Sequence, residues 1–338
     1  MARYQVRPLS PGDIPAAAQL LAARHASDRL RFPFFRDDLA TAVGAKAQLE
    51  TTLGEAGTRA AVADRGGELA GFLVTQPRLF SPTEMMALFL APHSLSIPTE
   101  GYAARAGEDL EALFRDLYGF LAADWVSAGF FDHTVEIVAG DGALQDAWVA
   151  LGFGRHVTAA TRPTADLVTS PVAGDVRIDR AGVEDIDVVM ELADELNRHH
   201  ALAPMFWPLV RTAEAAARGF NKAMLEANEH PYFVAYQGGA AAGMETFLRP
   251  GFTPGLVDQS KDVYLFEGIV GQQARSGGVG SALLAHGMAW ARDAGHATCT
   301  LHFAAQNFSG APFWLGQGFQ PITYTMRRVI DQRILWNR

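Results

Sequence analysis

The chain has one cysteine, Cys299, among 338 residues, so it can form neither an internal disulfide nor a cysteine-rich zinc module. It also lacks an apolar run near the roughly 20 residues that span a bilayer. Its start, MARYQVRPLSPGD, lacks the apolar segment of a signal peptide. Basic residues are in deficit, because 28 Lys and Arg against 37 Asp and Glu give a net charge of −9. We therefore expect a cytoplasmic protein with no membrane and no nucleic acid as a partner.

The residues that are present are sufficient for packed cores. Hydrophobic residues make up 49% of the chain and aromatic residues 10%, which excludes wholesale disorder. At about 150 residues per domain, the length predicts about two domains.

An internal repeat explains these two domains. Residues 61–71, AVADRGGELAG, resemble residues 233–243, FVAYQGGAAAG, and each segment is typical of a hairpin with a Gly-Gly turn. Further matches follow in the same order at similar spacing. We interpret the chain as a duplicated domain: residues 1–163, a linker at 164–174, and residues 175–338.

Local patterns in the second copy predict alternating strands and helices. We expect strands at 175–178, 263–270, 298–304 and 319–329, a hairpin at 232–248, and helices at 183–197, 206–225, 281–293 and 311–316. This order is typical of a layered α/β domain with a mixed sheet.

The strongest chemical signal is the segment 275–280, RSGGVG, between an expected strand and an expected helix. Consecutive backbone N–H groups at a helix start, together with the helix dipole, favour a phosphate group, and glycines allow its close approach. The spacing differs from the dinucleotide-binding fingerprint and lacks the Lys-Ser/Thr of a P-loop. A tight strand-to-helix turn without a ligand is the structural alternative.

Two motifs together give a family resemblance. The strand LFEGIV at 265–270 is followed by four residues and then by R-x-x-G-x-G, from Arg275 to Gly280. Further on, Asn307-x6-Trp314-x3-Gly318-Phe319 resembles the N-x6-Y-x3-G-F pattern. With both motifs, the second copy resembles the GNAT N-acetyltransferase superfamily. The resemblance implies an α/β fold of two tandem GNAT-like domains, each a mixed, mostly antiparallel twisted sheet flanked by helices.

The resemblance also implies acetyl-CoA as the cosubstrate, with no metal. The backbone near Ile269 and Val270 would pair with the pantetheine arm, and Asn307 would contact that arm from the neighbouring strand. The pyrophosphate would lie against the amides of Arg275, Ser276, Gly277, Gly278, Val279, Gly280 and Ser281.

Two side chains are candidates for catalysis, since amine acetylation needs a base for the amine. Glu267 interrupts an apolar strand near the acyl end of the expected site, where a carboxylate is costly unless it is paired or faces a cavity. His302, on the adjacent strand, could relay a proton. The structural alternatives are an ion-paired strand residue and a hydrogen-bonded core histidine.

The acceptor side is expected around the end of the first helix of the second copy. His199, His200, Phe206 and Trp207 would line the substrate loop, and Glu245 in the hairpin could bind a cationic amine. Adjacent histidines point in different directions on a helix and have no third ligand nearby, so we do not expect a metal site.

The sequence departs from the family pattern at Trp314, where the family often has a tyrosine that protonates the leaving thiolate. An indole N–H is not a useful acid near neutral pH. Thiolate protonation would then fall to water, another side chain or the amine proton. Trp148 has the same place in the first copy, which favours a packing role.

The first copy lacks the phosphate cradle. At an offset of 170, Glu108, Asp109 and Leu110 replace Gly278, Val279 and Gly280. Like charges about 4 Å apart repel by roughly 4 kcal/mol at an effective dielectric near 20. We expect the first copy not to bind acetyl-CoA but to pack against the second and complete the substrate pocket.

The leading hypothesis is an acyltransferase, active in the second copy only, that acetylates a primary amine of a small molecule or peptide. The chain would be a monomer or a homodimer. Two alternatives stay open: a noncatalytic acyl-CoA-binding or regulatory protein, and an aminoacyl-tRNA-dependent transferase of duplicated GNAT-like fold. The cradle and the charge of −9 count against the latter.

Overall fold

The computed structural model describes residues 4–166, 175–249 and 251–337, and most of the expected linker therefore lies outside the described residues. The first half contains β1 (Gln5–Pro8), α1 (Ile14–Arg31), α2 (Ala42–Gly54), β2 (Arg59–Arg65), β3 (Glu68–Leu79), β4 (His93–Ile97), β5 (Tyr102–Ala104), α3 (Leu110–Ser127), β6 (Asp132–Val138), α4 (Gly142–Ala150) and β7 (Gly154–Pro163). The second half contains β8 (Val176–Arg180), α5 (Ile186–Ala201), α6 (Glu214–Ala227), β9 (Tyr232–Gln237), β10 (Ala240–Leu248), β11 (Asp262–Val270), α7 (Val279–Asp293), β12 (Thr298–Ala304), α8 (Gly310–Gly316) and β13 (Gln320–Val329).

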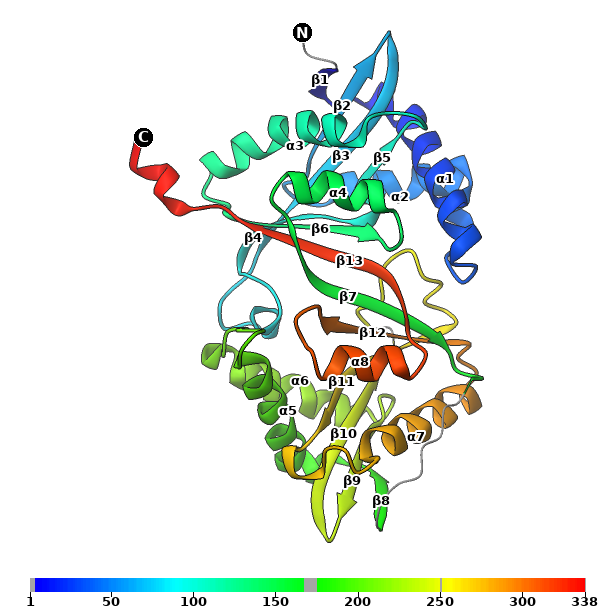
Figure 1. The fold of residues 1–338 in the computed structure, drawn as a ribbon, viewed down its shortest axis with the longest axis vertical. Coiled ribbons are helices and arrows are strands. Elements are labelled where there is room, and N and C mark those ends of the chain that lie inside the picture. Colours follow the sequence, from blue (N-terminus) through cyan, green and yellow to red (C-terminus); the bar gives the residue numbers. More distant parts are fainter. Residues whose placement is uncertain (1–3, 167–174, 250, 338) are drawn as a thin grey trace.

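The two halves repeat the same order of elements, except that β4 and β5 of the first half correspond to the single strand β11. Figure 1 shows the first half above and the second half below, with β7 and β13 crossing between them. The predicted fold class, α/β with mixed, mostly antiparallel sheets flanked by helices, is confirmed. The division at 163 and 175 remains a prediction, although β7 ends at Pro163 and β8 begins at Val176.

The last strands of the two halves are exchanged, which the sequence analysis did not predict. In the described residues the strands form one sheet in the order β1-β2-β3-β4-β6-β13-β7-β12-β11-β10-β9-β8. Strand β13 pairs with β6 of the first half, and β7 pairs with β12 of the second half. Periodicity identifies a strand but not its partner.

The exchanged strands contribute to the core of the opposite half. Met326 of β13 is 1% exposed within the cluster that surrounds Leu117 and Trp148 in the first half. Ala160 of β7 is fully buried within the cluster around Leu283 in the second half. Each half therefore depends on the other half of the chain for the pairing of its sheet and for the burial of apolar side chains.

Short-range signals predicted the local elements well. Both Gly-Gly pairs, Gly66-Gly67 and Gly238-Gly239, have positive φ angles and connect hairpin strands, as a tight turn of this kind requires. The expected helix at 206–225 is wrong at its start, because a short 3₁₀ turn and then α6 begin only at Arg211 and Glu214.

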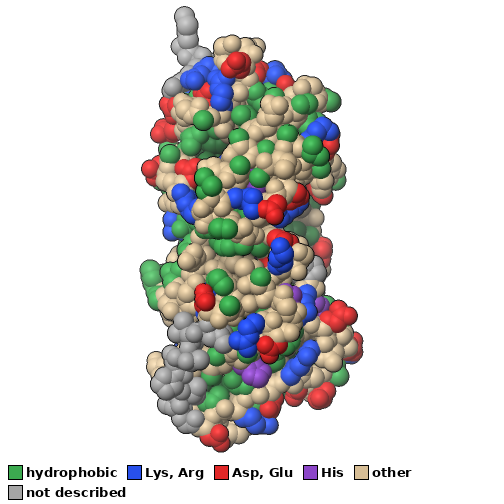
Figure 2. Space-filling model, turned by 90° about the vertical axis from the view of Figure 1, so that its right-hand side faces the viewer, with side chains coloured by type: hydrophobic (Ala, Val, Ile, Leu, Met, Phe, Trp, Pro, Cys, Tyr) green, Lys and Arg blue, Asp and Glu red, His purple; other side chains and the backbone are tan. Residues whose placement is uncertain are grey.

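Two long loops cross between the halves (Figure 1). The β3–β4 loop contains the 3₁₀ turn η3 (Met85–Leu88), which packs against α6 of the second half. The β10–β11 loop reaches the first half, where Val257 forms a β-bridge with Phe35. The face in Figure 2 shows acidic and basic side chains interspersed over both halves.

Strand exchange makes a testable prediction about core mutations. Met326→Ala should cost about 2–5 kcal/mol through the cavity it leaves. Because Met326 packs in the first-half core, hydrogen exchange should become faster in α3, more than 190 positions away in sequence. Hydrogen–deuterium exchange read by mass spectrometry measures this effect.

The matched control is Met288→Ala, since Met288 is fully buried in the cluster of the second half. It should accelerate exchange in α7 first. Faster exchange confined to the second half in the Met326→Ala chain would contradict the exchange of strands.

Candidate active site

The candidate site lies where two parallel strands separate. Strands β11 and β12 pair from Asp262 with Thr298 as far as Leu265 with Leu301, and the pairing then stops. Both strands continue, β11 to Val270 and β12 to Ala304. The β11 backbone at Ile269 and Val270, predicted to meet a pantetheine arm, lies beyond the last pair and faces this gap.

A β-bulge in β11 brings several predicted residues to one face. Thr246 pairs with Glu267 but Phe247 pairs with Leu265, so Phe266 is an extra residue. Leu265 packs in the core beneath α7, whereas Ile269 packs in the cluster with α5 residues. The bulge thus switches the alternation of side chains, and Phe266 and Glu267 share the α5 face.

Glu267 has the environment of a tunable base. The residue as a whole is half-buried, but its Oε2 atom is enclosed and has no hydrogen-bond partner among the described residues. Burial raises the pKa of this carboxyl from the usual 4.5 to about 7. A carboxyl that titrates near neutral pH is suited to accept a proton from an amine.

His302 lies one residue beyond the last β11–β12 pair. Its Nδ1 atom is 2.9 Å from the hydroxyl of Tyr264. Burial lowers the pKa of His302 to about 4, so the imidazole is neutral near pH 7. Burial also raises the pKa of Tyr264. Tyr264 is thus a hydrogen-bonded partner for the histidine, as the structural alternative expected.

Glu245 is placed differently from the other predicted residues. It is 2% exposed and lies opposite Gly268, with its Oε2 enclosed and unpartnered among the described residues. A Cβ at Gly243, two residues earlier, would touch Leu283 of α7. Glu245 therefore faces the α7 side, away from Glu267, and burial raises its pKa well above the usual value.

The predicted phosphate cradle is open toward an anion. Gly278 has a φ of 81° and is the N-cap of α7, and Ser276 has a φ of 65°. Within the described residues, no side chain caps α7 and no acidic residue lies in its first turn. A Cβ at Gly280 would lie 3.3 Å from Phe313, so a small residue suits this close approach. The first amides of α7 are thus available to a phosphate.

The remaining cradle residues have internal contacts as well. The Arg275 Nε donates to the carbonyl of Val270 at 3.1 Å. The Ser281 hydroxyl accepts from Gln317 at 3.0 Å. Asn307 is buried, and its Oδ1 accepts from the backbone N–H of Gly310 at 2.8 Å.

The predicted acceptor residues do not all meet at one place. His199, at the end of α5, has its Nε2 3.3 Å from the Ser309 hydroxyl, next to Asn307. Burial and the charge of Arg275 lower its pKa. The sequence analysis thus placed His199 at an acceptor loop, whereas the structure places it beside the predicted pantetheine contact.

His200 and Trp207 form an aromatic pair with 5.0 Å between ring centroids. Trp207 also lies 5.4 Å from His156, which comes from β7 of the first half. Burial lowers the pKa of His200 and His156 to about 4. Phe206 is 72% exposed with a φ of 52°, so it is separate from this packed group. His156 was missed because only the strand exchange brings it here.

The family's tyrosine position is filled by a packed indole. Trp314 is 9% exposed, and a Cβ at Gly268 would lie 2.9 Å from its ring. Trp148 is fully buried in the corresponding core of the first half. Among the described residues, no group of three His, Cys, Asp or Glu side chains is arranged to hold a metal ion, and no helix is long and apolar enough to cross a membrane.

In the first half the corresponding loop is shorter and contains a buried carboxylate, that of Glu108. Residues 105–109 connect β5 to α3, whereas residues 271–278 connect β11 to α7. The buried Glu108 carboxylate accepts from Tyr4 at 2.9 Å and from Arg105 at 2.7 Å, and it lies 3.1 Å from Arg65. Burial opposes ionisation, but these hydrogen bonds and charges hold its pKa below the usual value. Asp109 caps α3.

Two further contacts are present in the first half, one at the strand that corresponds to the end of β11 and one with the β10–β11 loop. The Arg24 guanidinium donates to the carbonyl of Tyr102 on β5, the strand that corresponds to the end of β11. On the same half, Leu256 and Val257 of the β10–β11 loop are fully buried, and Arg36 donates its backbone N–H to Leu256 at 2.8 Å.

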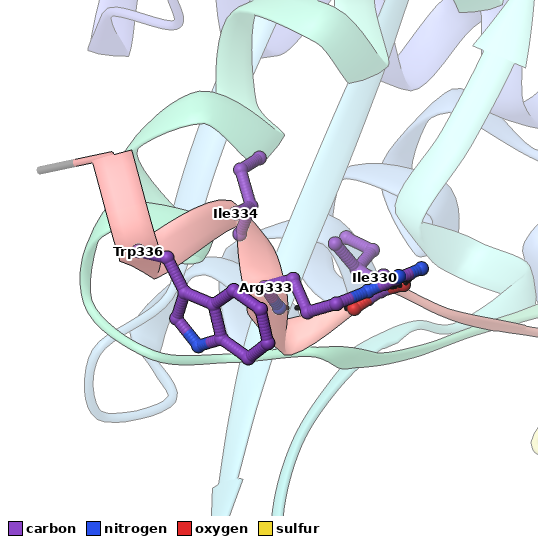
Figure 3. Close-up of a pocket in the computed structure, with 5 residues that line it drawn as sticks. Ile330, Arg333, Ile334 and Trp336 are labelled. Atoms are coloured by element: carbon purple, nitrogen blue, oxygen red, sulfur yellow. Dashed lines mark hydrogen bonds and ion pairs between the residues drawn. The ribbon is translucent and has the colours of Figure 1, made fainter.

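Two surface hollows lie away from these residues. One of about 590 Å³ is lined by Tyr4, Gln5, Arg7, Asp64, Arg65, Gly66 and Gly67. The other, of about 540 Å³, lies beside the C-terminal 3₁₀ helix, where Figure 3 shows Arg333 extended toward Ile330. Neither hollow includes a predicted site residue, so the separation of β11 and β12 remains the candidate.

Comparisons with known proteins bear on the family and the fold. Residues 195–319 match the Acetyltransferase (GNAT) family. Among curated proteins, none has a significant match to the sequence. The matched range 195–319 includes the cradle, Glu267, His302 and Asn307.

Solved structures extend the likeness to the whole chain. A GCN5-related N-acetyltransferase from Sphaerobacter thermophilus has 15% identity and a TM-score of 0.59, over 97% of this chain and 96% of that one. A glucosamine N-acetyltransferase region of a fungal multi-domain GH3 β-N-acetylglucosaminidase has 11% identity and a TM-score of 0.56, over 97% of this chain and 38% of that one. At such identities the likeness shows the fold, which is that of two tandem GNAT-like domains.

The Glu267 environment predicts a pH-dependent stability. The folded chain keeps a proton that the unfolded chain releases between pH 4.5 and about 7, so this contribution to stability is full below pH 4.5 and is lost as the pH rises through 7. Glu267→Gln stays neutral. At pH 8 it should therefore be more stable than the parent chain by up to about 3 kcal/mol.

Urea denaturation at pH 4.5 and pH 8 measures this difference, which should be much smaller at pH 4.5. Glu50→Gln, at an exposed carboxylate of α2 that pairs with Lys46, is the control and should change the free energy of unfolding by less than about 0.5 kcal/mol. Equal stabilities of the Glu267→Gln and parent chains at pH 8 would contradict the buried, unpartnered carboxyl.

Proposed function

Because residues 195–319 belong to the GNAT acetyltransferase family, we propose that the second half transfers an acetyl group from acetyl-CoA to a primary amine of a small molecule or peptide. The amine attacks the acyl carbonyl directly while both substrates are bound. The observation that carries this proposal is the carboxyl of Glu267 on the part of β11 that has separated from β12. Its Oε2 atom is enclosed and has no hydrogen-bond partner among the described residues.

The residues around the gap fit coenzyme A. Acetyl-CoA supplies an activated acetyl group when it is bound. The uncapped amides of Ser276 to Ser281 and the Arg275 side chain would hold the pyrophosphate. The edge of β11 at Ile269 and Val270 that no longer pairs with β12, together with the amide of Asn307, would hold the pantetheine arm.

Glu267 would accept the proton that the amine loses, since its pKa near 7 lies close to the working pH. His302 and Tyr264, joined by a hydrogen bond on the same face, would relay a proton to or from solvent. Trp314 is packed against Gly268 and supplies no acidic proton, so protonation of the thiolate falls to water or to another side chain.

The first half is proposed to be noncatalytic. Glu108 already supplies an anion at the start of α3, and Arg24 donates to the carbonyl of Tyr102. Leu256 and Val257 pack with Val138 and Ala139 at the end of β6. Each of these contacts would have to break before coenzyme A could bind in the usual manner. The first half would instead contribute β7 and the β3–β4 loop to the site of the second half.

The two alternatives make different demands on the same residues. A noncatalytic acyl-CoA-binding protein would not need a carboxyl with a raised pKa at the acyl end. An aminoacyl-tRNA-dependent transferase would need a basic surface, whereas the net charge is −9 and the charges on the face in Figure 2 are mixed. We therefore favour a cytoplasmic amine acetyltransferase, a monomer or a homodimer, with no nucleic acid or membrane partner.

Replacement of the proposed base should separate catalysis from binding. Glu267→Gln should lower kcat/KM by about 10²–10⁴, because general base catalysis contributes this much. The Kd for coenzyme A should stay within about twofold, since the carboxyl lies outside the cradle. Free-thiol release from acetyl-CoA with a panel of amines gives the rates, and the parent profile should rise with a pKa near 7.

The matched control is Glu136→Gln in the first half. Glu136 of β6 is at the position that corresponds to His302, and burial also raises its pKa to about 7. Its replacement should leave kcat/KM unchanged. A Glu267→Gln chain as active as the parent would argue against the base assignment, and thiol release by neither chain with any amine would favour the noncatalytic alternative.

The cradle makes a second prediction. Gly278 has a φ of 81°, which favours glycine. Gly278→Glu adds a side chain there and a carboxylate that repels the pyrophosphate, so it should weaken coenzyme A binding by about a thousandfold. Isothermal titration calorimetry on the full-length chain measures this, because strand exchange makes isolated halves unsuitable. Ala106→Glu, in the exposed loop of the first half, is the control with unchanged affinity. Unchanged affinity in Gly278→Glu would overturn the site.

A further inference from the structure

Four phenylalanine rings from four separate segments meet next to Glu267. Phe266 comes from the bulge of β11, Phe220 from α6, Phe252 from the β10–β11 loop and Phe89 from the β3–β4 loop of the first half. We call these four residues the aromatic wall. Ring centroids are 5.7 Å apart for Phe220–Phe266 and for Phe252–Phe266, 5.9 Å for Phe89–Phe266 and 6.4 Å for Phe89–Phe252.

The aromatic wall is exposed rather than sealed. Phe89 is 40% exposed and Phe252 is 42% exposed. In the described part of the chain, no arginine or lysine is stacked on these four rings. The corresponding loop contact in the first half is different, because Leu256 and Val257 are fully buried there. Adjacent exposed aromatic rings form an apolar surface that is suited to bind a ligand.

Phe89 is held against the second half by its own loop. The Thr212 hydroxyl, before α6, donates to the carbonyl of Pro82 at 2.8 Å, and η3 packs on α6. The aromatic wall is continuous with the site because Phe266 and Glu267 are neighbours on the bulge and share one face. A ligand on these rings would therefore have one end beside the carboxyl of Glu267.

We infer that the aromatic wall binds the body of the acceptor and selects a primary amine carried on a flat aromatic group, with Phe89 of the first half as a specificity-determining residue. This inference rests on the proposed function. An aromatic body buries its area against the rings and gains their edge and face contacts. A polyamine or an aminoglycoside has no flat apolar group to bury against the four rings, and its extra ammonium groups would gain only weak cation–π contacts there.

The experiment compares 2-phenylethylamine with spermidine and kanamycin as acceptors, following free thiol with the full-length chain. We expect kcat/KM for 2-phenylethylamine to exceed the other two by about tenfold or more. Phe89→Ser should raise the KM for 2-phenylethylamine about tenfold, with kcat within twofold and the Kd for coenzyme A unchanged. Phe89→Leu, which keeps an apolar side chain, should recover part of the loss.

Phe120→Ser is the matched control, since Phe120 is 44% exposed on α3, away from the aromatic wall. It should leave KM and kcat unchanged. Coenzyme A binding with turnover of spermidine or kanamycin only, or an unchanged KM in a folded Phe89→Ser chain, would overturn the inference but keep the proposed function. Failure to bind coenzyme A would overturn the proposed function, and this inference with it.

Discussion

The pairing of β7 with β12 is the interaction on which the rest of the structure depends. Strand β12 pairs with β11 on one edge only as far as Leu301. The first half supplies β7, which pairs with β12 as far as Ala304. Because β7 hydrogen-bonds to one edge of β12 along its whole length, the end of β12 stays part of the sheet even where its other edge has separated from β11. The gap that is proposed to hold the acyl donor is thus maintained by a strand from the other half.

The same architecture also explains why two similar halves differ in their chemistry. Each half extends a loop over the other, yet one loop buries Leu256 and Val257 while the other leaves Phe89 exposed. Each half has a helix that begins after the diverging strand, yet α3 is capped by Asp109 and α7 is not capped by a side chain in the described residues. In the first half, the Glu108 carboxylate supplies the negative charge that a phosphate would otherwise bring, and it forms ion pairs with Arg65 and Arg105.

Local features were predictable from sequence, whereas the strand pairings between the two halves were not. The Gly-Gly turns and the strand at 298–304 follow from short-range chemistry that is visible in the sequence. The helix expected at 281–293 is also present and begins two residues earlier, at Val279. The bulge at Phe266 was not predicted, although it decides which face Glu267 occupies, because a bulge depends on the partner strand. His156 and Phe89 were missed for the same reason, since they reach the site only through contacts between the halves. Glu245 was expected near the amine because it lies on a neighbouring strand, but alternation places it on the α7 face.

The central claim is that one site per chain, in the second half, binds coenzyme A. Hydrogen–deuterium exchange of the full-length chain with and without coenzyme A tests it most directly. The account predicts slower exchange on binding in residues 271–282 and 298–307, with no change in residues 105–112. Slower exchange in residues 105–112, or none in the second half at saturating coenzyme A, would contradict it.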